Sequence, residues 1–266
     1  MHIVVPIKQV PETNAVKMDE ATGTMIRDGV EAIVNPLDLF SIETALRLKQ
    51  THGATITAIS MGPPKAERAL REALSMGCDA AMLLSDKAFA GSDTWATARA
   101  LAAAVEKLDH APDLILCGER ATDGDTGQVG PAMAAFLDWP LATYVGQIES
   151  VDQNSCRVRR LVEDGYETLR LQMPCLLTVV KEIGQPRLPT LRGKQRARRA
   201  EVPVLSAAEL QVETKQLGLT GSPTRVVKIF RPKVARQGQL HRAVDPQSCQ
   251  DAAARLVEFL QQRDLL

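Results

Sequence analysis

The sequence predicts an α/β protein built on a doubly wound, mostly parallel sheet. Short apolar, β-rich runs recur at residues 2–8, 54–61, 80–84 and 114–117. Alanine- and leucine-rich helical patterns separate these runs, so strand and helix alternate through residue 140. Such an alternation implies a parallel sheet covered by helices on both faces, with ligands bound where loops leave the carboxyl ends of the strands.

The first helix and the segment before it carry clear local signals. A Thr-Gly turn between β-type stretches predicts a peripheral hairpin over residues 16–28. Asn35 is a good N-cap for the following helix, Pro36 fits its first position, and Gly53 suits its C-terminal stop.

The remaining elements follow in two blocks. Two further helices are predicted over residues 65–76 and 93–108. Helical patterns then vanish from residue 144 to 180, where short apolar stretches alternate with polar turns and predict antiparallel strands that extend the sheet. Residues 185–201 contain two prolines and six basic residues, which indicates an extended arm followed by a basic helix. A last amphipathic helix is expected around residues 247–262.

Composition limits the class of protein. With 266 residues and 45% hydrophobic content, we expect one large α/β domain over residues 1–184 and an appendage over 185–266. Lysine plus arginine equals aspartate plus glutamate at 32 each, so no global field attracts nucleic acid. The low aromatic content also removes the stacking platforms that nucleic-acid binding needs.

The cysteines and the hydropathy pattern indicate a compartment. The five cysteines are odd in number and form no CxxC pair, which argues against a disulfide framework, a zinc site or an iron–sulfur cluster. We interpret them as core thiols and expect a cytoplasmic protein. The N-terminus lacks a signal-peptide pattern and no segment reaches the roughly 20 apolar residues of a membrane span, so we expect no direct membrane insertion.

The loop after the run at 114–117 is the richest candidate site. It reads GERATDGDTGQVGPAMAAFL and precedes an apolar helix, so backbone donors and a helix N-terminus can meet a phosphate. The glycines permit close backbone approach, and Thr126 and Gln128 can bond phosphate or ribose oxygens. Asp123 and Asp125 repel a bare phosphate unless they turn toward ribose, metal or backbone. The loop is neither a Walker loop nor GxGxxG, so an elaborate loop with capping residues stays an alternative.

Two other loops are weaker candidates. Asp38 lies in the first turn of a helix, where its charge meets the positive end of the dipole, and simple capping explains it as well. Ser92, Asp93 and Thr94 precede the helix that includes Thr97, which indicates a cap and a candidate phosphate seat. The four histidines are scattered away from any nucleophile, so we expect no catalytic side chain and no metal site.

Together these pieces resemble the β subunit of electron-transferring flavoproteins. The resemblance runs from IVVPIKQVPE near the start to GSPTRVVKIF near the end, and its most specific stretch is VRRLVEDGYETLRLQMPCLLT at residues 158–178. It implies an adenine-nucleotide-binding-like α/β fold, extended by antiparallel strands and followed by an arm and helices that contact a partner. That partner is an α subunit that holds a flavin, so a heterodimer is expected.

The resemblance also implies site residues. The nucleotide-binding positions carried over are Pro6, Asn35, Pro36, Leu37, Asp38, Met61, Arg120, Ala121, Thr122, Asp123, Gly124, Asp125, Thr126, Gly127, Gln128, Val129, Gly130 and Pro131. The stretches NPLDLF, FAGSDT, DGDTGQVGP and GSPT are similar to those of the electron-bifurcating group, which adds Thr94, Thr97, Ser222 and Thr224. That group holds a second FAD at this site, whereas housekeeping members hold AMP. Leu191 matches the leucine that docks on acyl-CoA dehydrogenases, although it can equally pack on the neighbouring subunit.

The implied function is electron transfer. In the bifurcating interpretation NADH delivers a hydride to FAD, and electrons pass to the α-subunit flavin and to a low-potential ferredoxin or flavodoxin. The alternative is a housekeeping carrier with structural AMP, which accepts electrons from acyl-CoA dehydrogenases and passes them to a quinone-reducing partner. A third hypothesis is a non-redox, nucleotide-binding regulatory module, which the signature at 158–178 disfavours.

Overall fold

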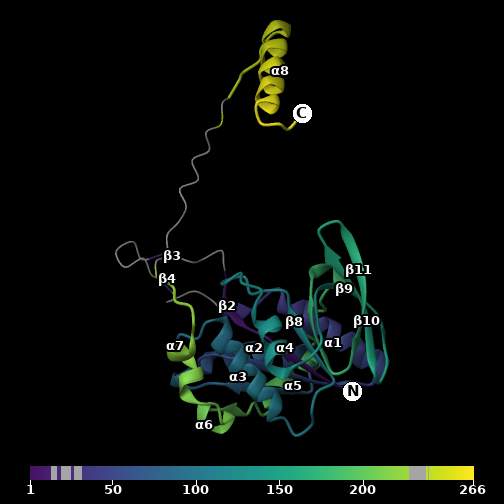
Figure 1. The fold of residues 1–266 in the computed structure, drawn as a ribbon, viewed down its shortest axis with the longest axis vertical. Helices are drawn as coiled ribbons and strands as arrows, with labels where there is room; N and C mark the ends of the chain where they lie inside the picture. Colours follow the sequence, from purple (N-terminus) through teal and green to yellow (C-terminus); the bar gives the residue numbers. More distant parts are fainter. Residues whose placement is uncertain (13–16, 19–24, 27–31, 228–237, 239) are drawn as a thin grey trace. The chain divides into compact units, whose positions relative to one another are not determined.

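The computed structural model describes residues 1–12, 17–18, 25–26, 32–227, 238 and 240–266. The chain forms two compact units, Met1–Lys228 and Ile229–Leu266. The second unit contains helix α8 (Pro246–Gln261), whose N-cap Asp245 accepts a hydrogen bond from the backbone of Ser248 (Figure 1).

The first unit is organised around a nine-stranded sheet of order β11-β10-β9-β12-β8-β1-β6-β7-β13. Its parallel core runs from β12 to β13, and β9 pairs parallel with β12 but antiparallel with β10. The strands are β1 (His2–Pro6), β6 (Thr55–Met61), β7 (Ala80–Leu84), β8 (Leu114–Gly118), β9 (Leu141–Val151), β10 (Ser155–Val162), β11 (Gly165–Gln172), β12 (Cys175–Val179) and β13 (Val204–Leu205). Two small pairs lie outside this sheet, β2 (Gln9–Pro11) with β5 (Ala32–Val34) and β3 (Lys17–Met18) with β4 (Met25–Ile26).

Helices cover both faces of the sheet, which makes the fold doubly wound. In the described part of the first unit they are α1 (Asp38–His52), α2 (Glu67–Met76), α3 (Thr94–Glu106), α4 (Val129–Leu137), α5 (Leu191–Arg199), α6 (Ala207–Leu210) and α7 (Gly218–Gly221). The short 3₁₀ turns are η2 (Pro64–Ala66), η3 (Lys87–Phe89), η4 (Lys181–Ile183) and η5 (Thr214–Gln216).

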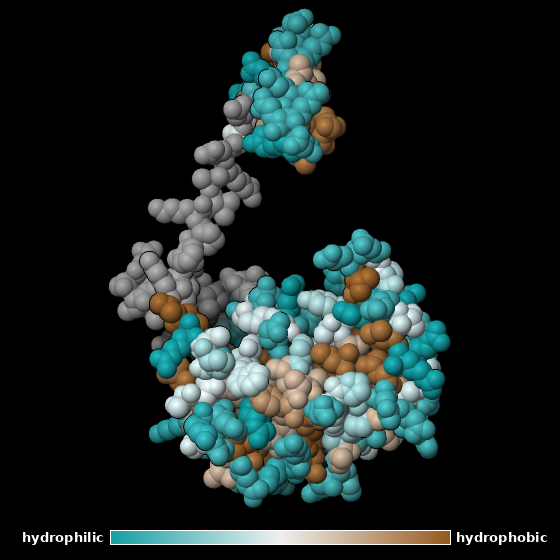
Figure 2. Space-filling model, in the orientation of Figure 1, coloured by the Kyte–Doolittle hydropathy of each residue, from teal (hydrophilic) through white to brown (hydrophobic). Residues whose placement is uncertain are grey.

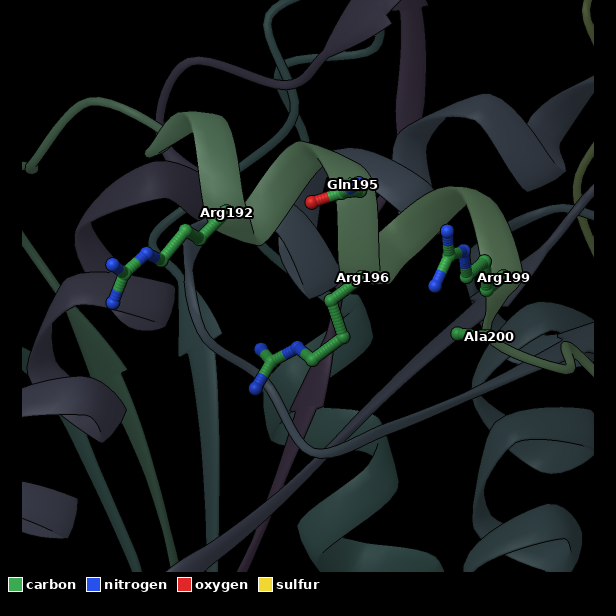
Figure 3. A pocket seen from close by; sticks show the side chains of 5 residues that line it. All are labelled: Arg192, Gln195, Arg196, Arg199 and Ala200. Carbon is green, nitrogen blue, oxygen red and sulfur yellow. The ribbon is translucent and has the colours of Figure 1, made fainter.

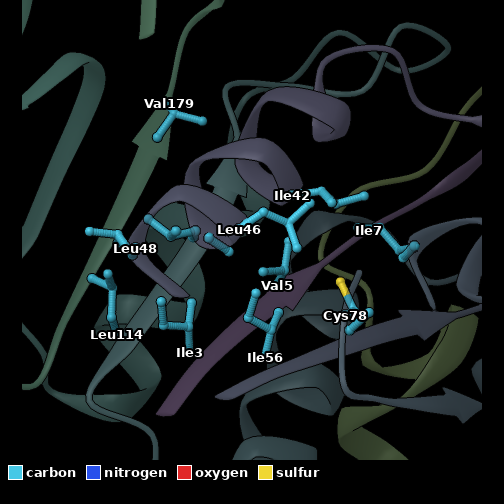
Figure 4. Packing of buried hydrophobic residues seen from close by; sticks show 14 of the residues in the cluster. Ile3, Val5, Ile7, Ile42, Leu46, Leu48, Ile56, Cys78, Leu114 and Val179 are labelled. Carbon is cyan, nitrogen blue, oxygen red and sulfur yellow. The ribbon is translucent and has the colours of Figure 1, made fainter. Parts of the chain in front are cut away.

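Side-chain alternation along the strands divides the core in two. Ile3 and Val5 of β1 pack on the face covered by α1, α2 and α5, together with Ile42 (Figure 4). Val4 points to the opposite face, in the cluster that contains Leu101 of α3 and Met133 of α4. The helices therefore bury apolar surface on each face, as the alternation of strand and helix predicts.

Most predicted elements are confirmed, with shifted ends. The helix after Asp93 begins at Thr94, and Gly53 ends α1 with a left-handed φ of 65° that a glycine adopts without strain. The basic helix at 191–199, the final helix and the antiparallel pairing of β10 with β11 are also present. The hairpin over 16–28 is present as the antiparallel pair β3 and β4, while its Thr-Gly turn lies outside the described residues.

Two predictions about elements and one about a cysteine are wrong. Helix α1 starts at Asp38 with Leu37 as its N-cap, because the Asn35 side chain is used elsewhere. The stretch that forms β12 is not antiparallel: it pairs parallel with β8 and β9, and its uninterrupted burial is typical of a central parallel strand. Four cysteines are buried, but Cys249 is exposed and is no core thiol.

Candidate functional site

The chain reverses its direction of winding between β1 and β8. From β1 it proceeds through β6 to β7 on one side, then crosses back to β8 on the other side of β1. The loops that leave the carboxyl ends of β1 and β8 consequently diverge to opposite faces. In open α/β sheets ligands bind in the crevice at such a switch point.

Asn35 joins the two loops across this switch point. It is fully buried; its Nδ2 donates to the carbonyl of Arg120 at 2.9 Å, and its Oδ1 accepts from the backbone of Thr122 at 3.1 Å. A second link is the ion pair between Lys8 Nζ and Asp123 Oδ1 at 2.7 Å. The structure therefore brings the predicted Asn35 and the 120–123 segment together, although they are more than 80 residues apart in sequence.

Asp38 lies buried beside these links. One carboxylate oxygen accepts from the backbone of Lys8 at 2.7 Å, and the other side of the carboxyl faces the end of β8, where Gly118 leaves space for it. Burial raises the pKa of Asp38 from its ordinary value of 3.8 to about 7, against the opposing effect of the Lys8 hydrogen bond. The carboxyl thus changes protonation near neutral pH.

The acidic groups of the long loop after β8 are paired with cations. Asp123 pairs with Lys8, and Asp125 lies 3.0 Å from Arg120 Nε in a left-handed conformation with φ of 53°. Gly127 also has a positive φ, at 62°. The repulsion expected between these aspartates and a phosphate is therefore compensated by neighbouring cations.

The N-terminus of α4 follows directly and is open to a ligand. Among the described residues no side chain caps it, and its N-cap residue is Gln128. Gly130 seats the helix tightly on the sheet, because a Cβ there would come within 2.9 Å of Thr178 on β12. Uncapped amides at a helix N-terminus attract anions such as phosphate.

A second helix N-terminus lies at the same edge and on the same face. Helix α3 follows β7, packs against α4 and begins at Thr94, with Asp93 accepting from the backbone of Ala96 at 3.0 Å. The cap predicted for Asp93 is confirmed. Although burial opposes it, hydrogen bonds from Thr224 and Ala96 hold the pKa of Asp93 below its ordinary value.

Ser222 and Thr224 are brought to this helix start from far along the chain. Ser222 Oγ accepts from the backbone of Asp93 at 2.8 Å and donates to Gly218, while Thr224 Oγ1 donates to Asp93 Oδ2 at 2.7 Å. Both hydroxyl protons are therefore used inside the protein.

Pro6 and Met61 lie at the carboxyl ends of β1 and β6. Val4 of β1 packs on the α3 and α4 face, so alternation directs Pro6 to that face as well. Met61, the last residue of β6, packs against the same cluster. Lys8 was missed by the sequence analysis; its position just after the first strand, at a carboxyl edge, was the available signal.

Leu191 lies away from these residues. It begins α5, which packs on α2, and it is 86% exposed. An open pocket of about 560 Å³ along α5 is lined by Arg192, Gln195, Arg196, Arg199 and Ala200 (Figure 3). Arg196 donates to the carbonyl of Cys78, which precedes β7, so this pocket lies at the amino edge of the sheet. The N-terminus of α5 is capped by Thr190, whereas that of α4 at the switch point has no side-chain cap.

The sequence matches a known protein family and several of its members over most of the chain. The family model described as electron transfer flavoprotein domain matches residues 22–210. The chain is 46% identical to the electron transfer flavoprotein subunit beta of Thermoanaerobacterium thermosaccharolyticum over 267 residues, which cover 100% of both chains. It is 42% identical over 100% of both chains to the caffeyl-CoA reductase-Etf complex subunit CarD of Acetobacterium woodii. It is also 46% identical to protein FixA of Azotobacter vinelandii, over 88% of this chain and 85% of that one.

Proposed function

This chain belongs to the electron transfer flavoprotein family as a β subunit, and from that premise we propose that it binds FAD at the β1–β8 switch point. We propose further that it accepts a hydride from NADH and passes electrons to the flavin of an α subunit and to a low-potential ferredoxin or flavodoxin. A bound flavin would supply the change from two-electron to one-electron chemistry. The chain itself contributes binding, orientation and exclusion of water.

The observation that carries the FAD proposal is the presence of two helix N-termini on one face of the sheet. The start of α4 is uncapped, whereas the start of α3, which packs against α4, is capped by Asp93 and carries the hydroxyls of Thr94 and Thr97. The N-terminus of α4 can seat the phosphate of AMP or the linked phosphates of FAD, and the hydroxyls on α3 can bond the groups that FAD has beyond its phosphates. The pair of helix starts therefore fits a dinucleotide better.

The residues present also fit the charge of a dinucleotide. Uncapped backbone donors at 128–130 are available to a phosphate, and the acidic groups nearby are paired with Lys8 and Arg120. The buried Asp38 lies beside the switch point, where it accepts a hydrogen bond from the backbone of Lys8. The second candidate function, a housekeeping carrier with AMP at α4, is favoured by the fact that the hydroxyl protons of Ser222 and Thr224 are already used.

The cofactor count of the purified heterodimer separates the two candidates. We expect two FAD and no AMP per heterodimer, measured by absorbance and by chromatography of the released cofactors. One FAD with one AMP would reject hydride transfer at this subunit and make it a structural and docking half.

We propose that residues 185–266 serve contacts with other proteins. Helix α8 exposes Leu256, Val257 and Phe259 by 45–58%, an apolar surface that needs a partner. Apolar side chains also interrupt the hydrophilic surface of the first unit at several places (Figure 2). The α subunit is the first candidate, because β subunits of this family pair with one. The structure of the described residues contains no helix long and apolar enough to cross a membrane.

Leu191 is proposed to dock on an acyl-CoA dehydrogenase-type partner. Replacing it by alanine is expected to raise the KM for that partner about thirtyfold, the effect of losing a binding hot spot, with kcat unchanged. The assay follows reduction of the heterodimer by a purified acyl-CoA dehydrogenase and its acyl-CoA. Leu188→Ala is the matched control, because Leu188 is also 86% exposed. Equal KM values for both variants would argue against the assignment.

A further inference from the structure

The arm that carries Leu191 is tied to helix α1 just before it becomes exposed. After β12 the chain forms the turn η4 and then has no regular structure in residues 184–190, up to the start of α5. Such a segment keeps a fixed course only if its backbone is held by other parts of the protein. Its first half is held by one stripe of α1, namely Glu43, Arg47 and Gln50. At its end Thr190 caps α5.

Glu43 is the centre of these contacts. Its side chain is 7% exposed, and Oε2 accepts from the backbone of Arg187 at 3.1 Å and from Arg187 Nε at 2.7 Å. Oε1 accepts from Arg187 Nη2 at 3.0 Å and from Arg47 Nε at 3.1 Å. The two carboxylate oxygens therefore receive four donors, in the fork geometry that gives charge-assisted hydrogen bonds their specificity.

Arg47 extends the attachment toward β12. Its Nη1 donates to the carbonyl of Ile183 at 3.1 Å, and a Cβ at Gly184 would overlap its guanidinium group. Arg187 also reaches Gln50 Oε1 at 3.3 Å. The arm is consequently held at residues 183 and 187, four residues before Leu191, by a helix whose first residue is the buried Asp38 of the nucleotide site.

We propose that Glu43 is a positioning residue that fixes the arm so that Leu191 is presented to an oxidoreductase partner. The proposal rests on the docking role given to Leu191 above. Without the carboxylate, Arg187 loses three hydrogen bonds and the segment 184–190 samples many courses. A partner then binds only those molecules in which the arm is correctly placed. The apparent Kd equals the intrinsic Kd divided by the fraction of such molecules, so the apparent affinity falls.

The test uses the heterodimer with Glu43→Gln, and Arg187→Lys as a second variant. Lysine keeps a positive charge beside Glu43 but cannot form the fork, so the second variant preserves the neutralisation of the buried carboxylate. Glu149→Gln is the control, because it removes an ion pair of 2.8 Å with Arg157 on strands far from the arm in sequence.

Two readouts separate placement of the arm from docking. We expect the backbone amides of residues 184 and 187, which donate to Lys181 and Glu43, to exchange hydrogen about tenfold faster in both variants than in the control. We expect the KM for the acyl-CoA dehydrogenase to rise about tenfold, with kcat and cofactor content unchanged. Unchanged exchange would overturn the role of Glu43 and leave the docking role of Leu191 intact. Faster exchange with an unchanged KM would instead overturn docking through this arm, which the Leu191→Ala measurement checks separately.

Discussion

Replacing Gly118 by alanine is expected to lower the melting temperature of the heterodimer by roughly 5–10 °C, the effect of about 2–3 kcal/mol of overpacking. The added Cβ would lie 2.5 Å from Asp38 Oδ1 and 2.8 Å from the backbone carbon and oxygen of Leu37. The backbone at the start of α1 cannot relieve this contact by a change of side-chain rotamer. The clash must therefore separate α1 from β8 at the switch point, and nucleotide content should fall with it.

The control for this substitution lies in the same loop. A Cβ at Gly124 meets nothing within 4 Å and the residue has no left-handed φ, so Gly124→Ala should leave the melting temperature unchanged. Thermal unfolding of both variants, with cofactor release measured in parallel, checks the prediction. A Gly118→Ala heterodimer with wild-type melting and full nucleotide content would contradict the close packing described here.

Asp38→Asn is expected to remove a pH dependence of stability worth about 4 kcal/mol. Since the pKa of Asp38 rises from 3.8 to about 7 on folding, the folded protein binds more protons than the unfolded chain between these values. Stability of the wild type therefore falls as pH rises from about 4 to 7 and then levels off, at about 1.4 kcal/mol for each unit between the two pKa values. Asparagine is not ionised, so the stability of the variant relative to the wild type should increase as pH rises from about 4 to 7.

Denaturant unfolding at pH 4.5 and pH 8 measures this difference. Asp152→Asn is the control, because hydrogen bonds from Asn154 and Ser155 lower the pKa of Asp152 below 3.8. The stability that this lowered pKa contributes is lost only below pH 3.8, so the difference between Asp152→Asn and wild type should be nearly the same at pH 4.5 and pH 8. If the difference between Asp38→Asn and wild type were the same at both pH values, Asp38 would be ionised throughout.

Local signals predicted the elements that depend on local chemistry. Gly53 ends α1 because a left-handed residue is needed there, and Asp93 caps α3 because its side chain reaches the amide three residues on. The alternation of apolar runs and helical patterns was likewise enough for the doubly wound class. The two caps depend on residues within a few positions of one another, and each apolar run is recognised within a short window.

The features that local sequence patterns did not predict depend on contacts between residues far apart in the sequence. Asn35 was expected to cap a helix, but its partners Arg120 and Thr122 lie across the sheet, and the order of strands decides that they meet. The contact between Glu43 and Arg187 spans 144 residues. Strand β12 was assigned to the antiparallel extension because hydropathy shows burial but does not show which neighbour a strand joins.

Because β12 lies between β8 and β9, the sheet cannot be completed in the order in which the chain is synthesised. The ribosome completes β9 and β10 before β12, yet β12 must lie between β9 and the central sheet. Until residue 179 has emerged, the edge of β8 stays unpaired, with its apolar residues Leu114, Ile115 and Leu116 beside it. An open apolar edge of this kind recruits other unfinished chains. Nascent chains of this protein that stall between residues 118 and 175 should therefore depend on chaperones more than those halted before β8.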